Sequence, residues 1–275
     1  MCAGVACGLA GLIVPAQIMT TVFGGSLITA PTVLLFRGLA LNHLVLGTRM
    51  CEAESDTKAS VPACFWFGSW AVILRRAMMA GTIGLTAATQ AYSNAVVAWT
   101  ATCALVAAFG QGGATATLQK IAEGGGPIPR KEKLKAKLLR PKTLVGVHLI
   151  LSGFACLAFQ PLLLGPSFLT TTLPGVPAAV GHGVKIVVGE YAKHALTLTG
   201  VGLTNILLGG ITLGGSDRAA AANGVVLLGG WAGGLYYARA AGLFTGQYVG
   251  LVALWHALVA ASCALMLLDE DTAWP

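Results

Sequence analysis

The chain has 275 residues, of which 56% are hydrophobic and only 10% are charged. Its mean hydropathy of +0.77 excludes an ordinary water-soluble domain, whose surface needs many more charged side chains. This composition predicts an integral membrane protein. The net charge of +7 does not indicate nucleic-acid binding, because the surplus lies mostly in one loop, without a basic helix on a soluble domain or interleaved aromatic residues.

Six long uncharged runs divide the sequence, and each can hold one or two membrane-spanning helices of about 20 residues. The runs are residues 1–36, 77–119, 143–184, 194–216, 219–238 and 240–268. No stretch of about ten residues alternates polar and apolar side chains as a membrane barrel requires. Helices are the other structure that satisfies its backbone hydrogen bonds in lipid. We therefore expect an all-α, polytopic integral membrane helix bundle with about eight transmembrane helices.

The expected crossings follow one another along the chain. They are residues 4–23 and 27–47, one that starts near residue 62, and then 91–110, 143–165, 194–213, 219–238 and 243–268. The second is the least regular, because it contains Pro31, Arg37 and His43, and without it seven crossings remain. A polar loop over Arg49–Ser60 precedes the third helix, whose first turn should contain Pro62.

The segment after the fifth crossing is expected to be irregular. Four prolines between residues 161 and 177 interrupt any helix there, so residues 166–183 should form a loop or a re-entrant hairpin. Residues 184–193 combine Lys185, Glu190 and Lys193 with apolar neighbours. This mixture indicates a short interfacial segment before the sixth crossing.

A basic segment separates two hydrophobic halves. Seven of the seventeen Lys and Arg residues lie in the stretch Arg130–Lys142, and three of them, Lys131, Lys133 and Lys135, are expected to contact lipid head groups or other anions. The sequence thus predicts an N-terminal transmembrane half (1–113), a Gly/Pro-rich and basic linker (114–142) and a C-terminal transmembrane half (143–275).

The positive-inside rule places this linker on the cytoplasmic or matrix side of its membrane, where anionic lipids attract basic segments. Four crossings in each half then put both termini and the loop Arg49–Ser60 on the same side. On this interpretation the outer loops carry little positive charge, apart from the neighbours of Arg75-Arg76 and of Asp217-Arg218.

The two halves show weak self-similarity. Trp70-Ala71 is followed by an arginine, a glutamine and Trp99, and Trp231-Ala232 is followed by a similar series that ends in Trp255. The stretches TCAL (102–105) and SCAL (262–265) come next in both halves. The intervals do not match without gaps, so duplication and coincidence both stay open. A duplication with four helices per half would make the halves parallel, not inverted.

Glycines recur at every fourth position in the C-terminal half. The main stripes are Gly242, Gly246 and Gly250, and Gly230 and Gly234. Such spacing lets helix backbones approach closely in lipid, where apolar burial does not drive association. Packing within the chain is the first interpretation. The alternative is that the stripe Gly242–Gly250 docks a helix of a partner.

Arg75, Arg76 and Arg239 are the candidate charged groups within the bilayer. An arginine at the centre of a membrane costs about 2.5–3.5 kcal/mol on insertion scales, so it usually pairs or reaches toward the interface. These three residues are expected to contact lipid head groups or anions. The alternative is that they anchor helix ends at the interface beside Trp70 and Tyr236-Tyr237, where aromatic residues are common.

We predict no catalytic, cofactor-binding or metal-binding residue. Haem in a membrane needs two histidines that face each other at equal depth, whereas His256 alone lies well inside a crossing and His43, His148 and His194 lie near the ends of theirs. Nucleophile, zinc-protease and P-loop motifs are absent. No acidic residue lies deep in a crossing, which argues against coupling to protons or cations.

These features predict a non-catalytic, multi-pass structural or accessory subunit of a larger membrane complex. Its expected partners are membrane lipids and other membrane-protein subunits, with no nucleic acid and no cofactor except bound lipids. Within that class we name a respiratory or ATP-synthase type assembly in an organellar, mitochondrial inner membrane. The alternative function is a lipid or anion transporter or channel that uses the intramembrane arginines. A membrane-bound redox enzyme would need a second histidine at the depth of His256.

Overall fold

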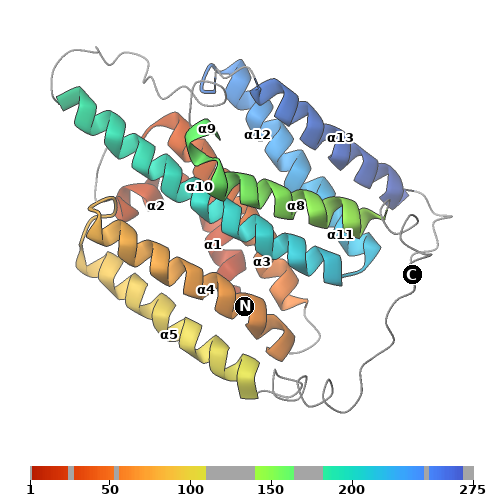
Figure 1. The fold of residues 1–275 in the computed structure, drawn as a ribbon, viewed down its shortest axis with the longest axis horizontal. Coiled ribbons are helices and arrows are strands. Elements are labelled where there is room, and N and C mark those ends of the chain that lie inside the picture. The colour runs from red at the N-terminus through yellow and green to blue at the C-terminus, as the bar shows by residue number, and fades with distance from the viewer. Residues whose placement is uncertain are drawn as a thin grey trace.

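The computed structural model describes residues 2–23, 28–52, 56–109, 140–163, 182–244 and 248–268, and all its elements in these ranges are helices. They are α1 (Cys2–Ile13), α2 (Pro15–Val22), α3 (Ala30–Cys51), α4 (Asp56–Met79), α5 (Ala87–Phe109), α8 (Pro141–Ala158), α9 (Gln160–Leu163), α10 (His182–Gly214), α11 (Asp217–Asn223), η2 (Gly224–Leu228), α12 (Gly229–Ala240) and α13 (Val249–Leu268). Helix α10 crosses the middle of the bundle, with α4 and α5 on one side and α12 and α13 on the other (Figure 1). The predicted all-α architecture is confirmed for this part of the chain.

Five of the described helices are long and apolar enough to cross a membrane. They are α3, α5, α8, α10 from Ala192 onward, and α13. The pair α1–α2 makes a sixth if it counts as one broken span. These helices fit an integral, multi-pass membrane protein, but the expected number of about eight is not confirmed. Helix α4 has 24 residues, but its Asp, Lys and Arg residues lower its hydropathy, so it is not one of the helices apolar enough to cross a membrane.

Two prolines act differently from the expectation. Pro15 breaks the crossing predicted over residues 4–23, and α1 and α2 meet at an angle of 106°. The residue before a proline is driven out of the helical region, and Val14 indeed has φ −125° and ψ 50°. Pro62 lies inside α4 instead of in its first turn, because α4 begins at Asp56. The polar loop predicted over residues 49–60 is therefore mostly helical.

Helix α10 also corrects the sequence interpretation. It runs without interruption over 33 residues, so residues 184–193 are its first part and not a separate interfacial segment. The loop or hairpin expected over residues 166–183 falls outside the described residues, except for the first two residues of α10. Most of the basic linker, with Lys131, Lys133 and Lys135, also falls outside them. Its end at Arg140 caps the start of α8.

The turn that ends α4 is repeated at the end of α12. Gly81 and Gly242 follow these helices with positive φ angles of 71° and 66°. In both turns, two successive N–H groups bond to the carbonyl oxygen of an alanine in the preceding helix, Ala77 in α4 and Ala238 in α12. Glycine suits this left-handed position because it lacks a Cβ atom. The two halves therefore share a turn of the same conformation and hydrogen bonding.

The two central helices, α3 and α10, contact each other through residues with a constant offset. Thr32 Oγ1 lies 2.8 Å from His194 Nε2, and Asn42 donates a hydrogen bond to Thr204 at 3.0 Å. Both pairs are separated by 162 residues. Because the sequence numbers rise together along the contact, α3 and α10 run in the same direction.

The helices outside this central pair also have matching positions in the two halves. The indole of Trp231 in α12 lies over Gly38 of α3, and that of Trp70 in α4 lies over Gly200 of α10. Gly38 and Gly200 have the same offset as the pairs in the centre. Among the described helices, α3 and α10 therefore run in parallel, with α12 and α4 packed on them in matching ways, which is the arrangement that a parallel repeat of the two halves predicts.

Glycines allow α8 and α10 to pack closely against each other. A Cβ atom added to Gly209 would lie 2.6 Å from the carbonyl oxygen of Gly146, and one added to Gly153 would lie 2.6 Å from that of Gly202. Within each helix the two glycines are seven residues apart, Gly146 and Gly153 in α8 and Gly202 and Gly209 in α10. This spacing keeps them on one face of the helix. The pair α1–α3 repeats this packing through Gly4, Gly11, Ala40 and Gly47.

Candidate functional site

A network of neutral polar side chains lies inside the bundle and is centred on Asn42 of α3. The buried amide of Asn42 donates hydrogen bonds to Thr204 Oγ1 at 3.0 Å and to Asn205 Oδ1 at 2.6 Å, both on α10. Its oxygen accepts a bond from Trp231 Nε1 of α12 at 3.1 Å. Both hydrogens and the oxygen of this amide are therefore used.

The network continues from α10 to α8. Asn205 Nδ2 donates to Ser152 Oγ at 3.2 Å, and Ser152 Oγ donates to the carbonyl oxygen of Leu149 at 3.0 Å. Four helices are joined in this way, where the hydrocarbon of a membrane would offer no water as an alternative partner. Interhelical hydrogen bonds of this kind hold membrane helices together. The amide, hydroxyl and indole groups of the network include no acid or base that titrates near neutral pH.

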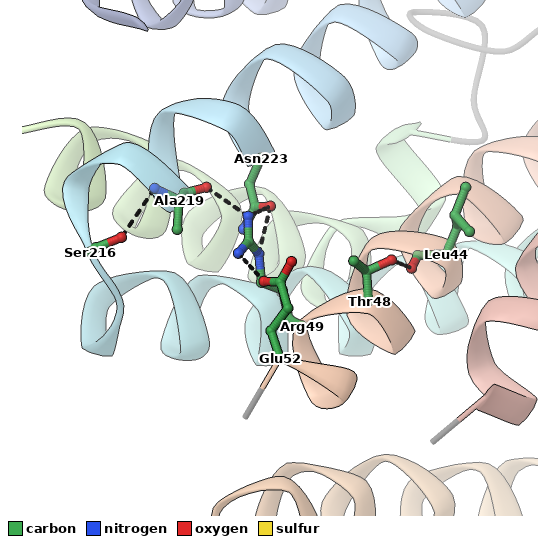
Figure 2. Close-up of polar contacts among 7 residues, drawn as sticks. All are labelled: Leu44, Thr48, Arg49, Glu52, Ser216, Ala219 and Asn223. Atoms are coloured by element: carbon green, nitrogen blue, oxygen red, sulfur yellow. Dashed lines mark hydrogen bonds and ion pairs between the residues drawn. The ribbon is translucent and has the colours of Figure 1, made fainter. Parts of the chain in front are cut away.

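A second polar cluster closes one end of the bundle, where α3 meets α11 (Figure 2). The guanidinium of Arg49 donates to Asn223 Oδ1 at 2.9 and 2.8 Å and to the carbonyl oxygen of Ala219 at 3.0 Å. It also pairs with Glu52 on its own helix. Asn223 is the last residue before η2, a short π-helical turn, so Arg49 fixes the point at which this helix changes its winding.

Asp217 lies at the same end of the bundle as the basic linker. Its buried carboxylate accepts a hydrogen bond from the Lys142 backbone N–H at 3.2 Å and lies 3.8 Å from Arg140 Nη1. The sequence interpretation counted the neighbours of Asp217-Arg218 among the outer loops. The structure instead puts Asp217 beside the end of the linker, at Arg140 and Lys142.

His43 and His194 were expected at the membrane interface, but the His194 side chain is buried and that of His43 is half-buried. The imidazole of His43 packs between two indoles, with ring centroids 4.8 Å from Trp66 and 6.0 Å from Trp70. His194 contacts Thr32 across the central helix pair. Both histidines thus belong to the packing between the central helices and their neighbours.

His148 and His256 form a contact that the sequence interpretation missed. Their rings lie edge to face with centroids 5.0 Å apart, although His256 was expected to stand alone. Trp255 Nε1 donates to His148 Nδ1 at 3.2 Å, and His256 Nδ1 lies 2.7 Å from the carbonyl oxygen of Val252. Rings in direct contact leave no position for an iron atom between them, so this pair does not have the geometry of two axial haem ligands.

The three candidate intramembrane arginines lie at helix ends. Arg75 and Arg76 are exposed near the end of α4, and Arg239 is exposed in the last turn of α12 beside Tyr236 and Tyr237. Positive charge is favourable at the C-terminal end of a helix. This placement supports the interpretation of interfacial anchors.

The glycine stripes have several different roles. Gly242 lies in the turn after α12 and not on a helix, so the predicted stripe Gly242–Gly250 is not one helix face, and Gly246 lies outside the described residues. Gly250 contacts the Arg239 guanidinium. Gly230 packs against Leu41 of α3, whereas Gly234 has free space around it. Packing within the chain therefore accounts for Gly230, and the free space beside Gly234 belongs to a groove between α1, α3 and α12.

The residues of the central network were not predicted. Asn42, Ser152 and the adjacent pair Thr204-Asn205 are neutral polar residues within apolar stretches, and nothing in their local sequence distinguishes them from polar residues placed there by chance. The signal that could have found them is the constant offset of 162 residues between α3 and α10, which pairs Asn42 with Thr204. No family model, curated protein or solved structure matches this chain, so the geometry of its helices is the evidence on its function.

Proposed function

We propose that this protein is a non-catalytic, multi-pass subunit of a larger membrane assembly, and that the outward face of α5 docks against a transmembrane helix of another subunit. The observation that carries this proposal is Asn94, an amide that is exposed on a membrane span and has no hydrogen-bond partner among the described residues. The polar network around Asn42 supports the non-catalytic part, because its groups bond to one another and hold helices together.

Small residues line the first part of one outward face of α5, and the large exposed side chains Leu105 and Phe109 follow on the same face toward the end of the helix. Ala91, Ala95, Ala98, Ala101 and Thr102 are all exposed and follow one another at helical spacing. Helix α5 packs chiefly on α4 and lies at the edge of the bundle (Figure 1). Small residues let two membrane helices approach closely, so this face suits a helix better than lipid chains.

Helix α13 occupies the corresponding edge of the other repeat and has a different surface. Its exposed side chains are large and apolar, as Leu251, Leu254, Leu258 and Leu265 illustrate. Such a face is suited to direct contact with lipid. The first part of α5 therefore exposes smaller side chains on this face than α13 does, which favours a protein partner at this part of α5.

Asn94 lies on the small-residue face, one helical turn after Ala91 and one turn before Ala98. It is the sixth residue of the apolar span that starts at Thr89, which places it about 7–8 Å into the span at 1.5 Å per residue. Its side chain is exposed and has no hydrogen-bond partner among the described residues. An amide in hydrocarbon without a hydrogen bond costs several kcal/mol, roughly 4–8 on a cyclohexane scale. A polar group on a neighbouring subunit would remove that penalty.

The orientation of the protein across the membrane is also part of this proposal. The end of the bundle that carries Arg49, Arg140 and Asp217 is also where the basic linker rejoins α8. The positive-inside rule then puts this end on the cytoplasmic or matrix side. The organellar inner membrane and the respiratory or ATP-synthase type of assembly stay predictions from the sequence.

The test is the native size of the protein after extraction in a mild detergent. The account expects the wild-type chain to migrate as part of a larger assembly and Asn94→Leu to release it. Tyr92→Leu is the matched control, because Tyr92 is exposed on a different face of the same helix. A photo-crosslinking residue at Ala98 should capture a protein partner, whereas one at Leu254 of α13 should capture lipid.

Two results would contradict this function. One is a wild-type chain that migrates as a monomer under the mildest extraction that keeps it folded. The other is an Asn94→Leu variant that stays in the assembly as firmly as Tyr92→Leu.

A further inference from the structure

An apolar groove of about 320 Å³ runs along the outside of the bundle between α1, α3 and α12. Its walls include Leu12, Leu34 and Leu41 on one side and Trp231 and Leu235 on the other. This volume falls in the range of about 300–1,000 Å³ that is typical of small-molecule sites. In a membrane protein a groove of this kind faces the acyl chains of lipids.

The groove exists because α12 has glycines where its counterpart α4 has side chains. Trp231 and Trp70 occupy equivalent places in the two repeats, so Gly230 and Gly234 correspond to Ser69 and Ile73. A Cβ atom at Gly234 would meet no atom within 4 Å, which shows that the space beside it is open. The two repeats therefore differ at the positions that open the groove.

The same groove has a cation that the other repeat lacks. Arg37 of α3 lines it, and the residue at the same offset in α10 is Thr199, which accepts a hydrogen bond from Gln160 at 2.7 Å. Arg37 is exposed and forms no hydrogen bond or ion pair with a described residue. An arginine inside a membrane span needs an anion or a path to the interface.

The direction of α3 gives Arg37 such a path. Side chains on a helix lean toward its N-terminal end, so Arg37 leans toward Ala30, the end of α3 at the membrane surface. Arg37 is about 10 Å from that end at 1.5 Å per residue. Its long side chain can place the guanidinium among lipid head groups while its methylene groups stay beside the groove.

We infer that this groove binds one anionic phospholipid. The phosphate pairs with the Arg37 guanidinium through charge-assisted hydrogen bonds, and one acyl chain lies along α12 over Gly234 toward Leu41. The position of Trp231 supports this arrangement, because its indole is held by Asn42 and by contact with Gly38 and so forms a fixed wall. The cation Arg37 requires a ligand with an anionic head group, and the apolar groove requires a ligand with an acyl chain.

Native mass spectrometry of the purified, delipidated protein tests this inference. The added lipids are phosphatidylglycerol and phosphatidylcholine with identical acyl chains, and inorganic phosphate is a third arm. The wild type should retain one phosphatidylglycerol in preference to phosphatidylcholine, and excess phosphate should not displace it. Arg37→Gln should weaken phosphatidylglycerol binding by roughly tenfold or more, which is the value of a hydrogen bond to a charged group, whereas Arg37→Lys should keep most of the preference.

A pair of glycine variants separates the groove from the rest of the surface. Gly234→Leu should fill the groove and abolish lipid retention with either head group. Gly233→Leu is the matched control, because Gly233 also has no atom within 4 Å of an added Cβ but does not line the groove. Equal lipid retention by both leucine variants would overturn the inference, as would equal affinity for the two head groups or displacement by phosphate alone.

Discussion

The side chain of Asn42 connects three helices, and its removal should be among the most destabilising single changes in the bundle. Asn42→Ala deletes three interhelical hydrogen bonds, to Thr204, Asn205 and Trp231. Hydrogen bonds between membrane helices contribute about 0.6 kcal/mol on average and up to about 1.7, so the three together correspond to roughly 2–5 kcal/mol. The half-buried indole N–H of Trp231 would also lose its partner, which adds to the cost.

The matched comparison is Ser152→Ala, at the edge of the same network. Ser152 accepts one bond, from Asn205 at 3.2 Å, so its removal should cost about 0.6 kcal/mol by the same average. Both variants can be measured by titration from mild detergent into SDS, with helix content by circular dichroism as the readout. If Asn42→Ala costs no more than Ser152→Ala, the network does not hold the helices together and the reasoning is wrong.

Three further changes test other contacts by the same unfolding titration. Gly209→Ala should destabilise the protein by about 1–3 kcal/mol, because the added methyl group collides with the backbone of α8. Gly210→Ala should be neutral or stabilise the protein by up to about 1 kcal/mol, because the space beside Gly210 is open. Equal effects of the two variants would refute the close approach of α8 and α10. Arg49→Gln should cost about 1.5–3 kcal/mol because Asn223 loses a charged donor, and an effect near zero would mean that the contact is not formed. Gly242→Ala should cost about 1–2 kcal/mol through its left-handed backbone alone, and a stabilised variant would contradict that conformation.

Composition predicted the helical membrane class and several elements well, because both follow from local chemistry. The last crossing is an example, since the uncharged run over residues 240–268 contains α13. Proline positions were less informative. Pro15 bends its helix pair by 106°, whereas Pro62 is accommodated inside α4. Which outcome occurs depends on neighbouring helices that can replace the lost hydrogen bond, and the local sequence does not contain this information.

The polar contacts were missed because they depend on which helices are neighbours. His148 and His256 are far apart in the sequence, and their contact exists only because α8 and α13 lie together. Asn42 and Thr204 are two single polar residues until the parallel repeat brings α3 against α10. The intervals between similar residues in the two halves are uneven even within one helix pair, because Trp99 and Cys103 lie closer together in α5 than Trp255 and Cys263 do in α13. Those differences concealed the repeat from a comparison without gaps.

The most direct test of the central claim, that hydrocarbon surrounds this bundle, is cysteine accessibility in sealed vesicles, with the native cysteines replaced. Ser216→Cys and Ala241→Cys lie at opposite ends of the segment α11–α12, and Leu258→Cys lies mid-way along α13, at a side chain that is 54% exposed in the isolated chain. The account predicts that a charged maleimide labels the first two from opposite sides and labels Leu258→Cys only after the membrane is dissolved. Labelling of Leu258→Cys in intact vesicles, or of both ends from one side, would contradict it.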